Sequence, residues 1–292
     1  MKLPLLEYIR PTTLSDAIAL LSAHGGDAKV IAGGQSLMPM LAFRLSSPGL
    51  LVDIGRLPDL DRIVVSEEGI DLGALVTWRD IERDGRLAQA HPLLAAAIAH
   101  VAHYQIRNRG TVGGSLAHAD PAAELPGIAV TCEATLTIVG ANGPRLLRAD
   151  EFILGGLDTA LASDEIVVNL RLPPWKLGRR WAFEEFARRR GDFALAGVAV
   201  FYDCDDHGNC RNTHVGAIGV DDRAARLTAV EALLDGQRLD AGLIATAADL
   251  ARDAVNPSDD IHAEAAYRRD LVGVLVERAL TRAGNIPLKE AA

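Results

Sequence analysis

Two short segments of the chain combine a glycine pair with hydroxyl side chains, a composition that suits a site for an anionic ligand. Glycine lets a ligand approach the backbone closely, and successive backbone N–H groups can converge on a phosphate. Two such segments in one chain predict an extended phosphate-bearing ligand held between two backbone cradles. The predicted binding residues are Ala32, Gly33, Gly34, Gln35, Ser36 and Leu37 in the first segment, and Gly110, Thr111, Val112, Gly113, Gly114 and Ser115 in the second.

The known nucleotide-binding fingerprints do not accompany these glycine pairs. Neither G-x-G-x-x-G nor G-x-x-x-x-G-K-[ST] occurs in the sequence. A single glycine pair is more often a structural turn, and only the presence of both segments favours a ligand site. If a dinucleotide binds, it does so on a fold other than the Rossmann or P-loop fold.

Composition narrows the class of protein. The 292 residues are 49% hydrophobic and 24% charged, which is ordinary for a globular chain long enough for two domains. The net charge of −9 argues against nucleic acid as the main partner. No apolar run reaches the roughly 20 residues of a membrane span, and the start of the chain lacks the pattern of a signal peptide. We therefore expect a cytoplasmic protein.

Three cysteines, Cys132, Cys204 and Cys210, are too few for a disulfide framework or for an iron–sulfur cluster with four Cys ligands. Residues 204–210, CDDHGNC, have zinc-like spacing, but a structural zinc needs four ligands and no second pair is nearby. The same stretch begins like a calcium loop, yet His214 stands where the bidentate Glu belongs. We expect an exposed hairpin turn there and no metal ligands in this chain.

The first unit, residues 1–57, is predicted as strand, helix and strand. Thr13 and Asp16 fit a capping box at the start of its helix. A short strand over residues 29–32 runs into the first glycine segment, and residues 50–54 form another strand. The first segment therefore follows a strand in a βαβ-like context.

The second unit, residues 58–175, is also predicted to mix strands and helices. Asn142-Gly143 is the strongest short hairpin signal in the chain. Asp120 and Pro121 predict the start of a helix through residue 130, because Asp caps free N–H groups and Pro suits the first helical position. A strand over 165–172 ends at Pro173-Pro174, the expected domain boundary.

The remainder, residues 176–292, is predicted as a smaller α+β domain. It contains arginines at 179, 180 and 188–190, which form either a solvated face or a docking surface for an acidic partner subunit. His100 and His103, in the preceding unit, are expected to be structural or solvated. The predicted antiparallel strands of the smaller domain are 182–188, 194–202 and 211–220, and its helices are 226–234, 241–255 and 263–282.

The sequence resembles the FAD-binding medium subunits of molybdenum hydroxylases, a family that includes carbon monoxide dehydrogenases and a matching domain of xanthine dehydrogenases. AGGQSLMPM at 32–40 is similar to the family's first FAD loop, and QIRNRGTVGGSLAHADP at 105–121 to its second. YIRPTTLSDAIALL near the start, RRRGDFALAGVAV at 188–200 and the C-terminal helices also align in order. The resemblance implies an α+β protein, with a vanillyl-alcohol-oxidase (PCMH)-type FAD domain in two α/β subdomains, about 1–57 and 58–175. A C-terminal domain of the carbon monoxide dehydrogenase flavoprotein type, 176–292, would follow.

The same resemblance implies roles for individual residues. Residues 32–36 and 111–115 would wrap the FAD pyrophosphate through backbone N–H groups and hydroxyls. Asp120 would hydrogen-bond the cofactor near its ribose or ribityl chain, besides serving as a helix cap. Val167 would pack against the adenine, although a core strand residue is an equal alternative. Phe193 stands where carbon monoxide dehydrogenase members tend to carry Tyr beside the flavin, so it either limits access to the flavin or is a core aromatic.

The resemblance also implies an electron-transfer subunit of a heterotrimer. A large subunit would carry the molybdenum-pterin cofactor and a small one the [2Fe–2S] clusters, in a dimer of heterotrimers. The FAD here would pass electrons to NAD⁺, a quinone or oxygen. No catalytic side chain is predicted in this chain, and its substrate class stays open. The rival hypotheses are a stand-alone FAD oxidoreductase and a non-catalytic assembly or binding subunit.

Overall fold

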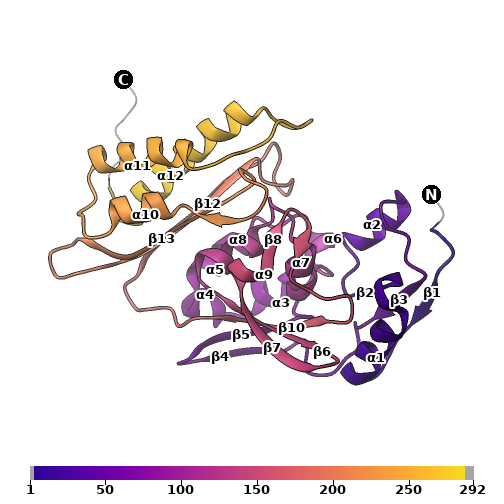
Figure 1. The fold of residues 1–292 in the computed structure, drawn as a ribbon. Coiled ribbons are helices and arrows are strands. Elements are labelled where there is room, and N and C mark those ends of the chain that lie inside the picture. Colours follow the sequence, from indigo (N-terminus) through magenta and orange to yellow (C-terminus); the bar gives the residue numbers. More distant parts are fainter. Residues whose placement is uncertain (1–2, 287–292) are drawn as a thin grey trace.

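The computed structural model describes residues 3–286 and arranges them around three main sheets (Figure 1). A three-stranded sheet lies at the N-terminal end, a five-stranded sheet lies in the middle, and a four-stranded sheet belongs to the C-terminal part. Among these residues, no helix has the length and apolarity needed to cross a membrane.

The N-terminal unit is a parallel sheet with the order β1-β3-β2 and one helix that packs on it. Thr13 begins that helix, because its side chain accepts a hydrogen bond of 3.1 Å from the N–H of Asp16. The predicted strand–helix–strand order is confirmed, but a short helix directly after the first glycine segment was not predicted. The elements are β1 (Glu7–Ile9), α1 (Leu14–His24), the 3₁₀ helix η1 (Gly25–Asp27), β2 (Ala28–Ile31), α2 (Leu37–Ala42) and β3 (Leu50–Asp53).

The central unit is an antiparallel sheet with the order β4-β5-β10-β6-β7, and helices cover one of its faces (Figure 1). The Asn142-Gly143 hairpin is confirmed, with Gly143 at a φ of 94°. The helices α5 (Pro92–Ile98), α7 (Val112–His118) and α8 (Glu124–Thr131) share one hydrophobic core with the sheet. The strands are β4 (Ile63–Ser66), β5 (Gly69–Gly73), β6 (Thr135–Gly140), β7 (Gly143–Arg148) and β10 (Ile166–Leu172), with a small pair β8 (Ile153–Gly155) and β9 (Asp158–Thr159).

The helices of the central unit depart from the predictions at two places. The expected helix at Pro121 begins only at Glu124, because the Asp120 carboxylate accepts a hydrogen bond of 2.9 Å from Ala122 and holds a turn instead. The second glycine segment is not a loop but the first turn of a helix. The helices are α3 (Trp78–Arg83), α4 (Leu87–Ala90), α5 (Pro92–Ile98), α6 (Tyr104–Arg107), α7 (Val112–His118), α8 (Glu124–Thr131) and α9 (Ala149–Phe152).

The C-terminal part is an antiparallel sheet, β11-β12-β13-β14, with three helices on one face and α8 of the central unit against the other. Its central strand β12 is therefore buried on both faces up to Asp203. The three predicted antiparallel strands are present, but the sheet has a fourth, because the short β14 pairs with β13 where a helix start was expected. The elements are β11 (Arg180–Phe186), β12 (Ala196–Cys204), β13 (Cys210–Ile218), β14 (Ala225–Arg226), α10 (Thr228–Leu234), α11 (Ala241–Asp253) and α12 (Ala265–Gly284).

Arg226 explains the fourth strand. Its guanidinium forms hydrogen bonds of 2.8 and 2.7 Å with Glu231 and one of 2.6 Å with Glu133 of the central unit. These bonds hold residue 226 extended across the junction, so the helix α10 begins two residues later, at Thr228. The signal was not visible in the sequence because Glu133 is 93 residues away.

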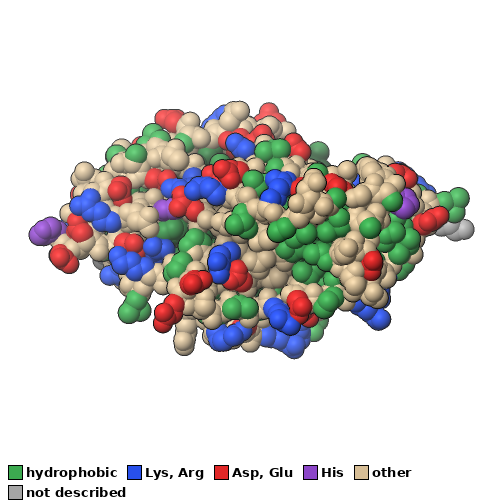
Figure 2. Space-filling view, turned by 60° about the horizontal axis from the view of Figure 1, so that its bottom comes forward, with side chains coloured by type: hydrophobic (Ala, Val, Ile, Leu, Met, Phe, Trp, Pro, Cys, Tyr) green, Lys and Arg blue, Asp and Glu red, His purple; other side chains and the backbone are tan. Residues whose placement is uncertain are grey.

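Charged side chains of both signs are interspersed over most of the face in Figure 2, while hydrophobic side chains gather toward its N-terminal end. Arg179 does not belong to a solvated basic face. It pairs with Asp203 at 3.0 Å, and its guanidinium lies over the rings of Trp175 and Phe201. Arg180, by contrast, is exposed.

Candidate FAD-binding site

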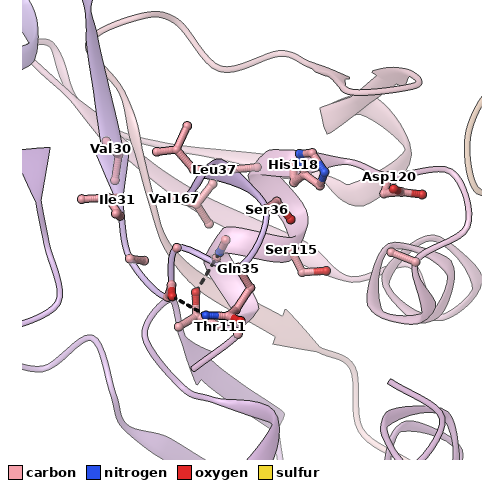
Figure 3. Close-up of a pocket in the computed structure, with 18 of the residues that line it drawn as sticks. Val30, Ile31, Gln35, Ser36, Leu37, Thr111, Ser115, His118, Asp120 and Val167 are labelled. Atoms are coloured by element: carbon pink, nitrogen blue, oxygen red, sulfur yellow. Dashed lines mark hydrogen bonds between the residues drawn. The ribbon is translucent and has the colours of Figure 1, made fainter. Parts of the chain in front are cut away.

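A cavity of about 670 Å³ lies where the N-terminal and central units meet (Figure 3). Its volume is within the roughly 300–1,000 Å³ of ligand pockets. Both glycine segments line it, as do Asp120, Val167 and Phe193. Val112 is the one predicted residue that does not, because its side chain is fully buried in the core of the central unit.

The two glycine segments are in direct contact, although 76 residues separate them. A Cβ atom on Gly33 would lie 1.9 Å from the carbonyl oxygen of Arg109, so no larger residue fits there. The Arg109 side chain returns to the first segment and donates a hydrogen bond of 3.3 Å to the carbonyl of Gly33. The close approach of two backbones requires glycine at this position.

The first segment offers a row of backbone donors. Gly34 has a φ of 74°, and the side-chain amide of Gln35 donates a hydrogen bond of 3.0 Å to the backbone carbonyl of Gly33. Together they fix the curve of the loop. Within residues 3–286, the N–H groups of Gly33, Gly34, Gln35 and Ser36 donate to no protein acceptor. Four successive free donors on a curved loop are a natural site for phosphate oxygens.

The second segment differs from the predicted backbone cradle. Thr111 is the N-cap of α7 and accepts a hydrogen bond of 3.1 Å from Gly114. The N–H groups of Val112 and Gly113 donate to the carbonyls of Val76 and Ala74, at 2.9 and 2.8 Å, and Ser115 donates to the carbonyl of Thr111. These four N–H groups are therefore already bonded within the chain. Instead, this segment presents hydroxyl side chains and two glycines, whose lack of a side chain leaves room for a ligand.

Figure 3 shows how the side chains surround the cavity. Ser36 from the first segment and Thr111 and Ser115 from the second face the same space, with His118 and Asp120 farther along. Val167 of β10 also lines the cavity, and it is 4% exposed and packed in the core. Its place in the core is confirmed, and its packing against the adenine stays a prediction.

Phe193 lies at the rim of the cavity, in the connection between β11 and β12. Its side chain is 66% exposed, so the alternative of a core aromatic is wrong. An exposed ring at the mouth of a cavity is placed where it can affect access to the interior.

Two cavity residues, His118 and Glu124, were missed by sequence reasoning. His118 lies three residues after Ser115 on α7, a spacing that puts both on one helix face, but the sequence does not predict this helix. Glu124 is 7% exposed, and burial, followed by the nearby Glu185 and Asp120 carboxylates, raises its pKa to about 8. The sequence signal for Glu124 is a single charged residue among small and apolar neighbours, in AAELPGIAV.

Positive charge surrounds a smaller adjoining cavity of about 320 Å³. Arg10, Arg56 and Arg109 line it, and Arg10 pairs with Asp53. These guanidinium groups favour an anionic portion of a ligand at the wall that both cavities share. The shared wall residues are Ala32, Gly33 and Thr111. Throughout the described part of the chain, no group of three or more His, Cys, Asp or Glu side chains is arranged to hold a metal ion.

Comparison with protein families defines the class of this protein. Residues 4–175 match the family described as the FAD binding domain in molybdopterin dehydrogenase, and residues 181–283 match the CO dehydrogenase flavoprotein C-terminal domain. The chain is thus an FAD flavoprotein with a PCMH-type FAD domain followed by a C-terminal α+β domain.

Individual relatives are similar over nearly their whole length. The 6-hydroxypseudooxynicotine dehydrogenase complex subunit alpha of Paenarthrobacter nicotinovorans is 38% identical, over 97% of this chain and 96% of the relative. The nicotine 6-hydroxylase medium subunit of the same organism is also 38% identical, over 97% and 99%. The structure of carbon monoxide dehydrogenase from Hydrogenophaga pseudoflava has a TM-score of 0.94 at 36% identity, covering 97% of this chain and 98% of that one. The chain belongs to the family of FAD-binding medium subunits of molybdenum hydroxylases.

FAD is the cofactor of this chain, and the residues of the cavity fit it. The free N–H groups of residues 33–36 match the needs of a pyrophosphate, while the cavity is large enough for an extended ligand. When bound, FAD supplies the capacity to take up and pass on electrons, and the protein supplies binding and orientation.

Proposed function

We propose that this chain is the electron-transfer subunit of a heterotrimeric molybdenum hydroxylase. The observation that carries this proposal is the built FAD cavity in a chain that has only three cysteines. Such a chain lacks the four Cys ligands of an iron–sulfur cluster, so any cluster that supplies electrons to its FAD lies on another subunit. The partners are a large subunit with molybdenum-pterin and a small one with [2Fe–2S] clusters, in a dimer of heterotrimers.

The role of the site residues follows from their bonding. The N–H groups of residues 33–36 hold the pyrophosphate, assisted by the hydroxyls of Ser36, Thr111 and Ser115. The Thr111 oxygen accepts from Gly114, which leaves its own hydrogen free to donate to a ligand. Asp120 accepts from cofactor hydroxyls near the ribose or ribityl chain, and Val167 packs against the adenine.

Phe193 is proposed to control access. Its exposed ring at the cavity rim shields the interior from water and from oxidants, and its movement admits the electron acceptor. The acceptor is NAD⁺, a quinone or oxygen. Relatives this similar are named for nicotine, caffeine and carbon monoxide, which supports a substrate site on the large subunit rather than in this chain.

The test begins with the visible spectrum of the purified chain and identification of the cofactor released on denaturation. Stoichiometric FAD that is reduced only when the two partner subunits and their substrate are present supports the proposal. Turnover of NADH or oxygen by the isolated chain would favour a stand-alone oxidoreductase. Failure to take up FAD, alone or with partners, would favour an assembly subunit.

The domain division is a proposal of the same kind. We place boundaries near residues 57 and 175, and the second coincides with an exposed connection that includes Lys176 and Leu177. Limited trypsin digestion is expected to cut first after Lys176. A first cut inside β12 or α12 would contradict the boundary.

A further inference from the structure

The hairpin between β12 and β13 carries two cysteines that the FAD site does not use. Cys204 is the last residue of β12, and Cys210 is the first of β13. The two are direct cross-strand partners in the antiparallel ladder. Both are free thiols, with Cys204 exposed and Cys210 buried.

The turn between them is tightly defined. The N–H of Asp205 donates to the carbonyl of Asn209 at 3.0 Å, and Gly208 donates back to Asp205 at 2.9 Å. Gly208 has a φ of 79°, the left-handed conformation of a three-residue hairpin loop with a bulge. The Asp205 carboxylate also accepts hydrogen bonds from the N–H groups of His207 and Asn209. The two strand ends are therefore held in a fixed register.

The backbone bonds of Cys210 show which kind of pair it forms with Cys204. Its N–H donates to Gln237 and its carbonyl accepts from Gly236, both at 2.7 Å. These groups point away from β12, so the two cysteines form a non-hydrogen-bonded pair. In such pairs the Cα atoms are about 4.5 Å apart and the side chains lie close together on one face. That separation is within the roughly 4.4–6.8 Å that a disulfide spans.

We propose that Cys204 and Cys210 are a reversible oxidation site, at which a hydroperoxide converts the two thiols into a cross-strand disulfide. The exposed Cys204 meets the oxidant first. Burial, followed by the neighbouring Cys204, raises the pKa of Cys210 to about 12, so Cys210 is not the thiol that reacts first. Its position directly opposite Cys204 is what allows the second step.

The reaction balances in two steps. The Cys204 thiolate attacks one peroxide oxygen, the O–O bond breaks, and a sulfenic acid and one water (or alcohol) form. The sulfur of Cys210 then attacks the sulfenic sulfur, the S–O bond breaks, and a second water leaves with the thiol proton. Two thiols lose two electrons and two protons in total, and the hydroperoxide takes them up.

The consequence is local. The disulfide closes a ring that includes the Asp205–Asn209 turn. It also fixes the start of β13, where the backbone of Cys210 is hydrogen-bonded to Gly236 and Gln237. Closing a short ring removes freedom from the unfolded chain. The oxidised protein is therefore expected to melt a few degrees above the reduced one.

The experiment treats the full chain with a small excess of hydrogen peroxide, alkylates the remaining thiols without reduction, and maps the cysteines by mass spectrometry. Trypsin leaves both cysteines in one peptide, residues 191–211, because no Lys or Arg lies between them. The expected product is this peptide with an internal disulfide, lighter by two hydrogens and alkylatable only after a thiol reductant is added. Cys132, which is buried and has its pKa raised to about 12 by burial, is the internal control and stays alkylatable only after unfolding.

Two variants separate the steps. Cys210→Ala is expected to accumulate a sulfenic acid at Cys204 that a dimedone-type probe captures, and Cys204→Ser is expected to leave Cys210 unmodified. Because both changes lie at a hairpin end, circular dichroism first shows that each variant is folded. Three results would overturn the proposal: both thiols remain free, Cys204 links only to a second copy of the chain, or Cys204 is oxidised to a sulfinic acid in wild type without any intramolecular bond.

Discussion

Substituting Gly33 by alanine would force apart the two segments that form the cofactor site. The new Cβ would lie 1.9 Å from the Arg109 carbonyl oxygen and 2.7 Å from its carbonyl carbon. An ordinary contact between carbon and oxygen is about 3.3 Å or more, so the backbones must separate by about 1.4 Å. Neither neighbour is the end of a flexible side chain, because both atoms belong to the main chain of residue 109.

The expected cost comes from overpacking between two backbones. Such changes cost about 1–3 kcal/mol, and the upper end applies here because no side chain can rotate away. At roughly 2–4 °C per kcal/mol for a chain of this size, the melting temperature falls by about 6–12 °C. The row of N–H donors at residues 33–36 moves with the backbone, so FAD affinity falls by about tenfold or more.

The assay pairs thermal unfolding with a titration of apoprotein by FAD, followed by the quenching of flavin fluorescence. The matched control is Gly85→Ala, because a Cβ at that position meets no atom within 4 Å. Its melting temperature and FAD affinity are expected to equal those of wild type within error. A Gly33→Ala protein with both wild-type values would refute the close contact between the segments.

Three further substitutions test other parts of the structure. Phe193→Tyr is expected to change turnover with at least one acceptor several-fold in the assembled complex, and identical rates for every acceptor would contradict a role at the rim. Glu124→Gln removes a carboxyl whose pKa is raised to about 8 by burial and by Glu185. Because this carboxyl ionises near pH 4.5 in the unfolded chain, the wild-type protein should lose stability as pH rises from about 4.5 to 8, by at most about 1.4 kcal/mol per pH unit. The variant should lose less over the same range. Parallel stability curves for the two proteins would count against a buried neutral acid. Arg179→Met is expected to cost about 3 kcal/mol of unfolding free energy, because it leaves the buried carboxylate of Asp203 without its 3.0 Å partner. The same change at exposed Arg180 is the control and should be nearly neutral. Equal losses in the two variants would show that the ion pair does not stabilise the fold.

The sequence predicted those features that depend on neighbours along the chain. Thr13 caps a helix through a bond to the N–H group three residues later, and Asn142-Gly143 forms its hairpin. Residues 204–210 form the predicted hairpin turn. In each case the hydrogen-bond partners lie within a few residues, so residue type and spacing are sufficient. The two glycine segments and the family resemblance also predicted an FAD-binding protein, which the family match confirms, and both segments line the cavity.

Two predictions about helices failed, for different reasons. Pro121 was expected to begin a helix, and a local hydrogen bond from Ala122 to the Asp120 side chain holds a turn there instead. The second failure depends on partners far apart in the chain. Thr111 to Ser115 was expected to be an open cradle. Its N–H groups are bonded because Ala74 and Val76 lie beside it in the folded protein, some forty residues earlier in the chain.

The sequence by itself therefore determined the family, the cofactor and the positions of the two glycine segments. Only the tertiary structure decided which chemical groups each segment offers to a ligand. Residues 33–36 retain free backbone donors, while the second segment contributes hydroxyls and a surface without side chains. The same is true of Glu124, whose raised pKa depends on burial and on Glu185, a residue of the C-terminal sheet. The physical reason is that a hydrogen bond or a desolvated charge is set by which atoms surround a group in space, and residue spacing along the chain does not specify those atoms.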